Sequence, residues 1–215
     1  MSDLPMPEVR LIDNCLQEHW PDAQCELLAA DPFEFLVAVI CSAQTSDTRV
    51  NQVMASLQEH LCGIEAYATI ALPQLERLLS RLPFYRAKAR SIHECARVIL
   101  QQHQGVMPRD AQALCQLPGV GAKTAAVVLA NRLQVPAIAV DSHVQRCSQR
   151  LGLSRQQRPS AIEADLRRRF PAHRWTQLCH QLIRLGREYC RPQRPKCSSC
   201  PLSQACPRYG VTKPR

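Results

Sequence analysis

No stretch of this chain is long and apolar enough to cross a membrane. The longest uninterrupted apolar run, residues 35–41, has seven members, whereas a membrane-spanning helix needs about 20. The first residues also lack the basic segment and apolar core of a secretory signal. We therefore expect a soluble, cytoplasmic protein, associated with the nucleoid if it is bacterial.

Convincing signals for β-strands are also lacking. Proline and glycine separate segments whose apolar residues recur at helical spacing, which predicts helices at about 7–20, 48–60, 73–80, 86–103, 110–116, 160–170 and 173–187. The apolar run at 35–41 is compatible with a buried strand, but Asp31, Pro32 and Glu34 before it are typical of a helix start. We expect a buried helix there, ending near residues 42–44, and an all-α fold.

Acidic residues are scarce in the last third of the chain. Residues 141–215 contain 16 Lys and Arg but four Asp and Glu, a net charge of +12, whereas residues 1–140 carry a net charge of −3. A membrane surface attracts such a segment too, but no basic amphipathic helix with exposed aromatic residues accompanies it. The asymmetry therefore favours nucleic acid as the polyanionic partner.

Cysteine, in contrast, is abundant, with 12 in the chain. Without a secretory signal, we expect free thiols or metal ligands instead of disulfides. Four of them lie within 17 residues at the spacing C-x6-C-x2-C-x5-C: Cys190, Cys197, Cys200 and Cys206. Four thiolates can enclose either a tetrahedral zinc ion or an iron–sulfur cluster. Arg191, Arg194 and Lys196 stand between the first two cysteines, so a metal centre there can brace a loop that presents cations to DNA.

A glycine turn runs directly into an apolar helix at residues 117–124, Leu-Pro-Gly-Val-Gly-Ala-Lys-Thr. Gly119 and Gly121 permit positive φ angles and close backbone approach, so successive N–H groups can form an anion-binding nest. The next helix adds its free first-turn N–H groups and the positive end of its dipole. We expect a DNA phosphate to bind along Pro118, Gly119, Val120 and Gly121, a contact that positions the duplex without reading its sequence.

Lys123 has two interpretations. The apolar run at 125–130 predicts a helix buried on all sides, with Lys123 at its mouth. Partial desolvation and the helix end would then disfavour the ammonium and favour a neutral, nucleophilic amine. The alternative is a solvated lysine that only touches phosphate. The eight residues alone favour the phosphate contact, because short motifs produce false positives.

Three other sites have a structural and a functional interpretation. Asp141 can cap the helix that follows it, and on sequence alone we prefer that interpretation. Gln44 and Asp47 lie where a core helix is expected to reach the surface, and local capping explains them equally well. Phe84 and Tyr85 can stack on bases, but a solvated helix face over two core aromatics is favoured for them and for the basic patch around them: Arg81, Arg86, Lys88 and Arg90.

These stretches together resemble the endonuclease III family of DNA base-excision glycosylases, within the helix-hairpin-helix superfamily. The resemblance spans nearly the whole chain. It is carried by residues 117–121 with Lys123 two positions on, by Val-Asp-Ser-His-Val at 140–144, by Ser-Ala-Gln at 42–44, and by the complete four-cysteine spacing.

The resemblance implies an all-α protein of two lobes that binds double-stranded DNA as a monomer. One lobe is a six-helix barrel over residues 23–134, with the helix-hairpin-helix at about 112–131. The other joins residues 1–22 to 135–215 and holds a structural [4Fe–4S] cluster in the loop 190–206, with ligands Cys190, Cys197, Cys200 and Cys206.

The resemblance also assigns the catalytic roles, against the interpretations preferred above. It implies that Lys123 is a nucleophile that attacks C1′ of a flipped, damaged nucleotide and forms a Schiff base, and that Asp141 is its catalytic partner. β-Elimination then nicks the strand. Gln44, with Leu82 or Phe84, is expected to fill the gap left by the flipped base. The implied activity is a bifunctional DNA N-glycosylase and abasic-site lyase of base excision repair, acting on damaged, oxidised pyrimidines.

Three residues depart from the family pattern: Pro83 replaces a glycine, Cys115 stands where some members have a carboxylate, and Ser142 replaces a threonine. They bear on substrate preference more than on reaction type. Two alternatives remain. A monofunctional mismatch or uracil glycosylase typically lacks a lysine at position 123, and a non-catalytic DNA-binding iron–sulfur protein needs neither Lys123 nor Asp141.

Overall fold

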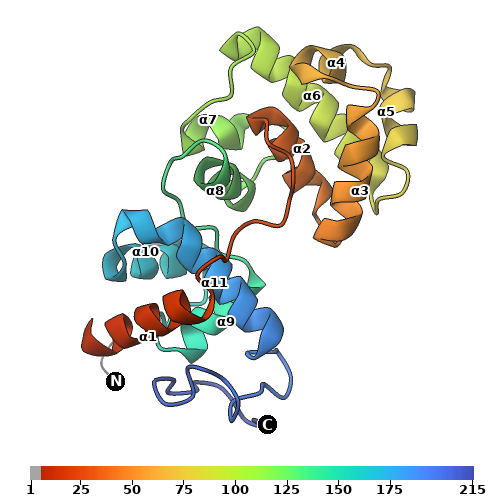
Figure 1. Cartoon of the computed structure of the whole chain (residues 1–215). Coiled ribbons are helices and arrows are strands. Elements are labelled where there is room, and N and C mark those ends of the chain that lie inside the picture. The colour runs from red at the N-terminus through yellow and green to blue at the C-terminus, as the bar shows by residue number, and fades with distance from the viewer. Residues whose placement is uncertain (1–5) are drawn as a thin grey trace. The chain divides into compact units, whose positions relative to one another are not determined.

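Helices are the only regular elements in residues 6–215, the part of the chain that the computed structural model describes (Figure 1). The prediction of an all-α fold is therefore confirmed. None of the described helices is both long and apolar enough to span a bilayer. The helices are α1 (Met6–His19), α2 (Pro32–Cys41), α3 (Asp47–Gln58), α4 (Gly63–Thr69), α5 (Leu72–Leu78), α6 (Tyr85–His103), α7 (Ala111–Gln116), α8 (Ala122–Asn131), α9 (Ser142–Arg150), α10 (Pro159–Arg169), the 3₁₀ helix η1 (Ala172–Arg174) and α11 (Trp175–Glu188).

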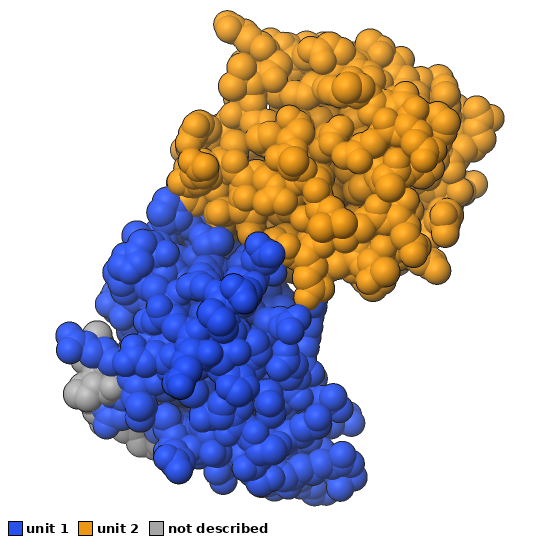
Figure 2. All heavy atoms as spheres, viewed as in Figure 1, with its two compact units in different colours: residues 1–24, 136–215 blue, residues 25–135 orange. Residues whose placement is uncertain are grey.

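Contacts divide the chain into two compact units (Figure 2). One is continuous, residues 25–135, and contains α2 to α8. The other joins α1 to the segment 136–215, which contains α9 to α11. The sequence places the domain boundaries at residues 23 and 134, and the structural units change at 25 and 135.

The continuous unit is built around α2, which contacts α3, α4, α6 and α8. Its start follows from the sequence: the Asp31 side chain accepts hydrogen bonds from the backbone N–H groups of Phe33 and Glu34, both at 2.9 Å, and Pro32 occupies the first turn. Every residue from 35 to 41 is buried. The apolar run therefore forms a core helix, as its capping signal predicts.

Helix α4 has no counterpart among the predicted helices. It begins after Cys62, whose side chain makes no capping hydrogen bond, so the local sequence carries no start signal. Its Tyr67 is buried and packs edge-on against Phe33, with ring centroids 5.3 Å apart. This short helix depends on tertiary packing against α2 and α6, which local periodicity does not reveal.

The two segments of the discontinuous unit share one hydrophobic core and are also joined by a buried ion pair. Arg174 donates to a carboxylate oxygen of Asp13 on α1 and to the amide oxygen of Gln181 on α11, each at 2.7 Å. The Arg174 side chain is nearly inaccessible to solvent. A buried guanidinium needs these acceptors, because an unpaired charge in a protein interior is costly.

We predict that Asp13→Ala lowers the free energy of unfolding by about 3 kcal/mol, because it leaves the Arg174 guanidinium buried without its carboxylate. Urea denaturation followed by circular dichroism measures the change. Glu8→Ala is the control, since Glu8 is an exposed acid on the same helix. Equal stability of the two variants would contradict the role of the pair.

Candidate functional site

The glycine turn joins α7 to α8, which contact each other. Two apolar side chains, Leu117 and Val120, are buried on either side of it, and the Val120 N–H donates to the Leu117 carbonyl at 3.1 Å. These anchors hold the turn as a rigid hairpin. The peptide groups at its tip are positioned by the core and not by polar side chains.

The two glycines of the turn differ in backbone conformation and in the space around them. Gly119 has φ +78°, and a Cβ on it would lie 2.6 Å from Cβ of Ser91 on α6. Gly121 has φ −95°, and a Cβ there would meet nothing within 4 Å. The prediction of a positive φ is therefore wrong for Gly121, whose backbone any residue can adopt. Gly121 precedes α8 without a side-chain cap, so the space beside this helix start is open.

Lys123 is exposed, in the first turn of α8. The expectation of a helix buried on all sides is wrong, because the buried side chains Ala125, Val128 and Leu129 share one face and the intervening residues are partly exposed. Within its unit, Lys123 therefore does not have the desolvation that the apolar run predicts. Its amine is open to a ligand instead.

The two loops expected to contact bases have similar backbones. Gln44 and Phe84 are both exposed and both left-handed, with φ 56° and φ 57°. The structure separates Leu82 from Phe84: Leu82 is 3% exposed and packs in the core, whereas Phe84 is 64% exposed. Of the two, Phe84 has the exposure that a contact with DNA requires. Ser46, not Asp47 or Gln44, caps α3.

One member of the expected basic patch is not on the surface. Lys88 is 5% exposed, and its Nζ donates to the backbone carbonyls of Cys41 and Ala43, each at 2.8 Å. Arg81, Arg86 and Arg90 remain exposed. The prediction that Lys88 lies on a solvated helix face is wrong. The charge pattern of a helix does not show that backbone carbonyls of a distant segment will accept hydrogen bonds from one of its lysines.

Asp141 caps α9, as its position predicts. Its Oδ1 accepts hydrogen bonds from the N–H groups of His143 and Val144, both at 2.8 Å. The cap fixes the half-buried carboxylate through this one oxygen. Lys123 belongs to the unit 25–135 and Asp141 to the other unit, so neither unit alone contains both residues.

Arg146, which the sequence analysis did not single out, ties α9 to the segment that follows α11. Its guanidinium donates to the carbonyls of Cys190 at 2.8 Å and Gly186 at 3.2 Å, and lies 3.1 Å from Nδ1 of His143. A Cβ on Gly186 would lie 2.7 Å from that same Nδ1. The close approach fixes the helix of Asp141 against α11, and only the glycine hints at it in the sequence.

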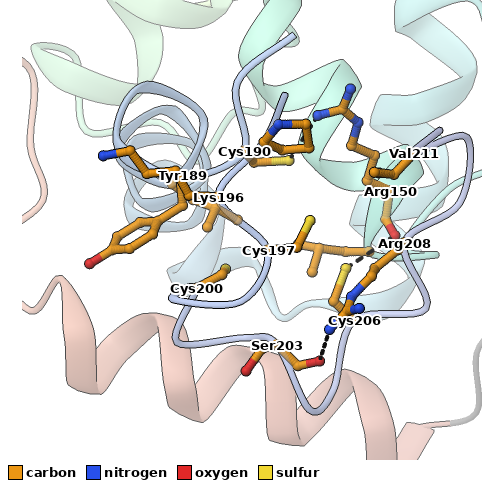
Figure 3. A pocket seen from close by; sticks show the side chains of 13 residues that line it. Arg150, Tyr189, Cys190, Lys196, Cys197, Cys200, Ser203, Cys206, Arg208 and Val211 are labelled. Carbon is orange, nitrogen blue, oxygen red and sulfur yellow. Dashed lines mark hydrogen bonds between the residues drawn. The ribbon is translucent and has the colours of Figure 1, made fainter. Parts of the chain in front are cut away.

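The four C-terminal cysteines line one pocket, and their sulfur atoms turn toward a common space (Figure 3). Arg150 holds the first part of the loop, donating to the carbonyls of Arg191 at 2.6 Å and Pro192 at 2.9 Å, and its Nη1 lies 3.5 Å from Sγ of Cys190. Lys196 and Arg208 also line the pocket. Three cations around four thiols give the pocket the charge that suits an anionic centre.

The thiols differ in acidity. A hydrogen bond from the buried Cys147 thiol, aided by Arg150, lowers the pKa of Cys190 to about 6 against the opposing effect of burial. Burial raises the pKa of Cys200 to about 11 and also raises the pKa of Cys206. Within residues 6–215, no three His, Cys, Asp or Glu side chains are grouped as ligands of one metal ion.

Comparisons with known proteins agree with this geometry. Residues 37–172 match the family described as HhH-GPD superfamily base excision DNA repair protein. The chain is 40% identical over 205 residues to endonuclease III of Bacillus subtilis (strain 168), covering 94% of each chain. It is 35% identical over 191 residues to endonuclease III of Escherichia coli (strain K12), covering 89% of this chain and 90% of that one.

Solved structures give the same picture. A trapped endonuclease III–DNA covalent intermediate matches with a TM-score of 0.89 and 38% identity, covering 95% of this chain and 97% of that one. A thermostable thymine-DNA glycosylase matches with a TM-score of 0.83 at 21% identity, covering 94% of this chain and 97% of that one. The second likeness concerns the fold alone.

The two glycines of the turn should respond differently to substitution. Gly119→Ala is expected to lower the free energy of unfolding by about 2 kcal/mol or more, because alanine is strained at positive φ and would clash with Ser91. Gly121→Ala, its matched control, should change it by less than about 0.5 kcal/mol. Denaturant titration compares them, and a Gly121→Ala loss as large as that of Gly119→Ala would contradict the assignment.

Proposed function

Because the chain belongs to the endonuclease III family of helix-hairpin-helix base excision repair proteins, we propose that it is a bifunctional DNA N-glycosylase and abasic-site lyase. The observation that carries the proposal is Lys123, an exposed amine in the first turn of a helix whose start is open to a phosphate. A hairpin that only bound DNA would not need an amine there.

The hairpin supplies the seat for the DNA backbone. Pro118 to Gly121 present peptide groups at the uncapped start of α8, where the helix dipole favours an anion. The space above Gly121 lets a phosphate oxygen approach the backbone closely. A phosphate bound here places the adjacent sugar within reach of a side chain from the first turn.

Lys123 then acts as the nucleophile. Its amine attacks C1′ of the extruded nucleotide as the C1′–N bond to the damaged base breaks, and opening of the sugar ring at the C1′–O4′ bond then gives an imine between Nζ and C1′. The imine acidifies the C2′ hydrogens, and loss of one of them with the 3′ phosphate cleaves the strand. Since Lys123 is exposed in its own unit, we assign the desolvation that activates the amine to bound DNA, which excludes water from the site.

Asp141 is the partner of this reaction. Its Oδ1 is fixed by the α9 cap, which leaves Oδ2 to stabilise positive charge developing on the sugar and to accept or return protons. The cap therefore supports the catalytic role and does not compete with it. We propose that Asp141 and Lys123 act on the same nucleotide.

Gln44 and Phe84 are the residues proposed to fill the gap in the duplex. Both are exposed side chains on left-handed backbone, and an amide and an apolar ring suit the polar edge and the faces of the bases beside a flipped nucleotide. Of the two candidates for this role, we assign it to Phe84 and not to the buried Leu82. Pro83, which lies between these two residues, stiffens the loop.

The four C-terminal cysteines fit a [4Fe–4S] cluster. All four line one pocket with three cations, which suits the negative charge of a cluster held by four thiolates. The cluster would supply structure, since no step of the reaction transfers electrons. Around it, Arg191 and Arg194 are exposed and Lys196 is half-buried, so the loop can offer cations to DNA phosphates.

We propose damaged pyrimidines in duplex DNA, and abasic sites, as the substrates. A monofunctional glycosylase and a non-catalytic binding protein are the alternatives. Lys123 disfavours the first, and the pairing of Lys123 with Asp141 in the family motifs disfavours the second. Neither the hairpin nor the cluster loop distinguishes the three.

Borohydride trapping tests the nucleophile. Wild-type protein should form a reduced covalent complex with duplexes carrying an abasic site or thymine glycol, and Lys123→Ala should lose it while its affinity for DNA changes by less than about threefold, because a single exposed cation contributes little to binding. Arg191→Ala is the control: it should weaken binding and lower the salt dependence yet still be trapped at saturating DNA. Trapping that survives in Lys123→Ala would refute the assigned role.

Iron analysis tests the cluster. The purified protein should be brown and contain about four irons per chain. Cys197→Ser should lose the iron and the visible absorbance, whereas Cys115→Ser, at an exposed thiol outside the pocket, should keep both. Stoichiometric zinc without iron in the wild type would contradict the cluster.

A further inference from the structure

The two wedge residues, Gln44 and Phe84, have backbones that need external support. Neither is glycine, yet both have φ near +56°, in the left-handed region that most side chains avoid. Such conformations persist where the surrounding structure determines them, and they concentrate at functional sites. The two exposed loops therefore need contacts from neighbouring residues.

Lys88 contacts both of them. Its ammonium donates to the carbonyls of Cys41 and Ala43, each at 2.8 Å, and Ala43 is the residue directly before Gln44. Its backbone N–H donates to the carbonyl of Phe84 at 3.1 Å. The bond to Phe84 is the regular i→i−4 bond of the first turn of α6, so the Lys88 side chain holds the segment before Gln44 against the helix that begins after Phe84. All of these atoms belong to the same unit.

The ammonium of Lys88 binds backbone carbonyls and is shielded from solvent. It is 5% exposed, and no carboxylate pairs with it in the described part of the chain; its acceptors are carbonyls at the C-terminal end of α2, where the helix dipole is negative. Burial lowers the pKa of Lys88. A lysine kept in such a place costs desolvation, so its hydrogen bonds must serve a purpose beyond filling the core.

A second tie joins the same loops from outside. The guanidinium of Arg49, at the start of α3, donates to the carbonyl of Arg81 at 3.3 Å. Arg49 is exposed, so water competes for this bond. The buried tie through Lys88 is the one that can fix the distance between the loops.

We propose that Lys88 is a positioning residue that fixes Gln44 and Phe84 relative to each other, so that both enter the duplex together when a nucleotide is extruded. The assignment rests on the function proposed above. Lys88 contacts no DNA in this arrangement and acts through the two backbone segments that it joins.

The test uses a duplex with a non-cleavable abasic analogue opposite 2-aminopurine, whose fluorescence rises when it loses its stacking. Wild-type protein should produce the rise, and Lys88→Met, which keeps the aliphatic stem but no donor, should produce a rise roughly threefold smaller or less at saturating protein. On a cleavable abasic duplex, Lys88→Met should lose about tenfold in kcat/KM, whereas on an abasic single strand, which has no opposite base, the loss should be under about twofold.

Two comparisons separate positioning from a loss of stability. Ile99→Ala removes a buried side chain from the other end of α6 and should leave the ratio of duplex to single-strand activity unchanged. The double variant Lys88→Met with Gln44→Ala should be no worse than Gln44→Ala alone, because both changes disable one wedge. Lys88→Gln, which keeps an amide donor, is measured as well and stands in if Lys88→Met does not fold.

The proposal is wrong if Lys88→Met reduces both activities in the same proportion as Ile99→Ala, or if its loss multiplies with that of Gln44→Ala. Failure of the proposed function gives a different result: wild-type protein then cleaves neither abasic substrate and is not trapped by borohydride. In that case the fluorescence comparison between wild type and Lys88→Met still decides whether Lys88 positions the wedge.

Discussion

The contact between Gly119 and Ser91 sets the geometry of the DNA-facing side of the continuous unit. A Cβ at position 119 would lie 2.6 Å from the Ser91 side chain, so the hairpin rests directly on α6. Lys88 precedes Ser91 by three residues on that helix, a spacing that places two residues on one face. The hairpin proposed to seat a DNA phosphate and the residue proposed to position Gln44 and Phe84 therefore share one rigid support.

In the other unit, α9 likewise supports two features of the proposed site. Asp141 begins the helix, and Arg146 and Arg150, one turn apart, bind the carbonyls of Cys190, Arg191 and Pro192. The proposed catalytic carboxylate and the proposed cluster loop are thus fixed to the same nine-residue helix. A cluster in that loop would stabilise the position of the carboxylate without contacting it.

The sequence analysis succeeded where local chemistry determines structure. Asp31 and Asp141 cap helices through their own side chains, as their positions predict, and the capping pattern identifies the buried α2 as a helix. Prediction from the sequence failed where contacts with distant segments determine whether a side chain is buried. The burial of Lys88 depends on carbonyls 45 and 47 residues away in the chain, and the exposure of Lys123 depends on which face of α8 is covered. The amino-acid composition predicts neither the burial of Lys88 nor the exposure of Lys123.

The division of the chain also bears on the order of folding. Residues 25–135 are continuous, so this unit can complete its core before the rest of the chain is synthesised. Helix α1 precedes that unit in the chain but must wait for α11, because its Asp13 and the Arg174 that it binds are 161 residues apart. Closing so long a loop costs entropy, but the folded middle unit shortens the effective distance between the ends. Helix α1, although it is synthesised before residues 25–135, is therefore expected to be among the last elements to reach its native contacts.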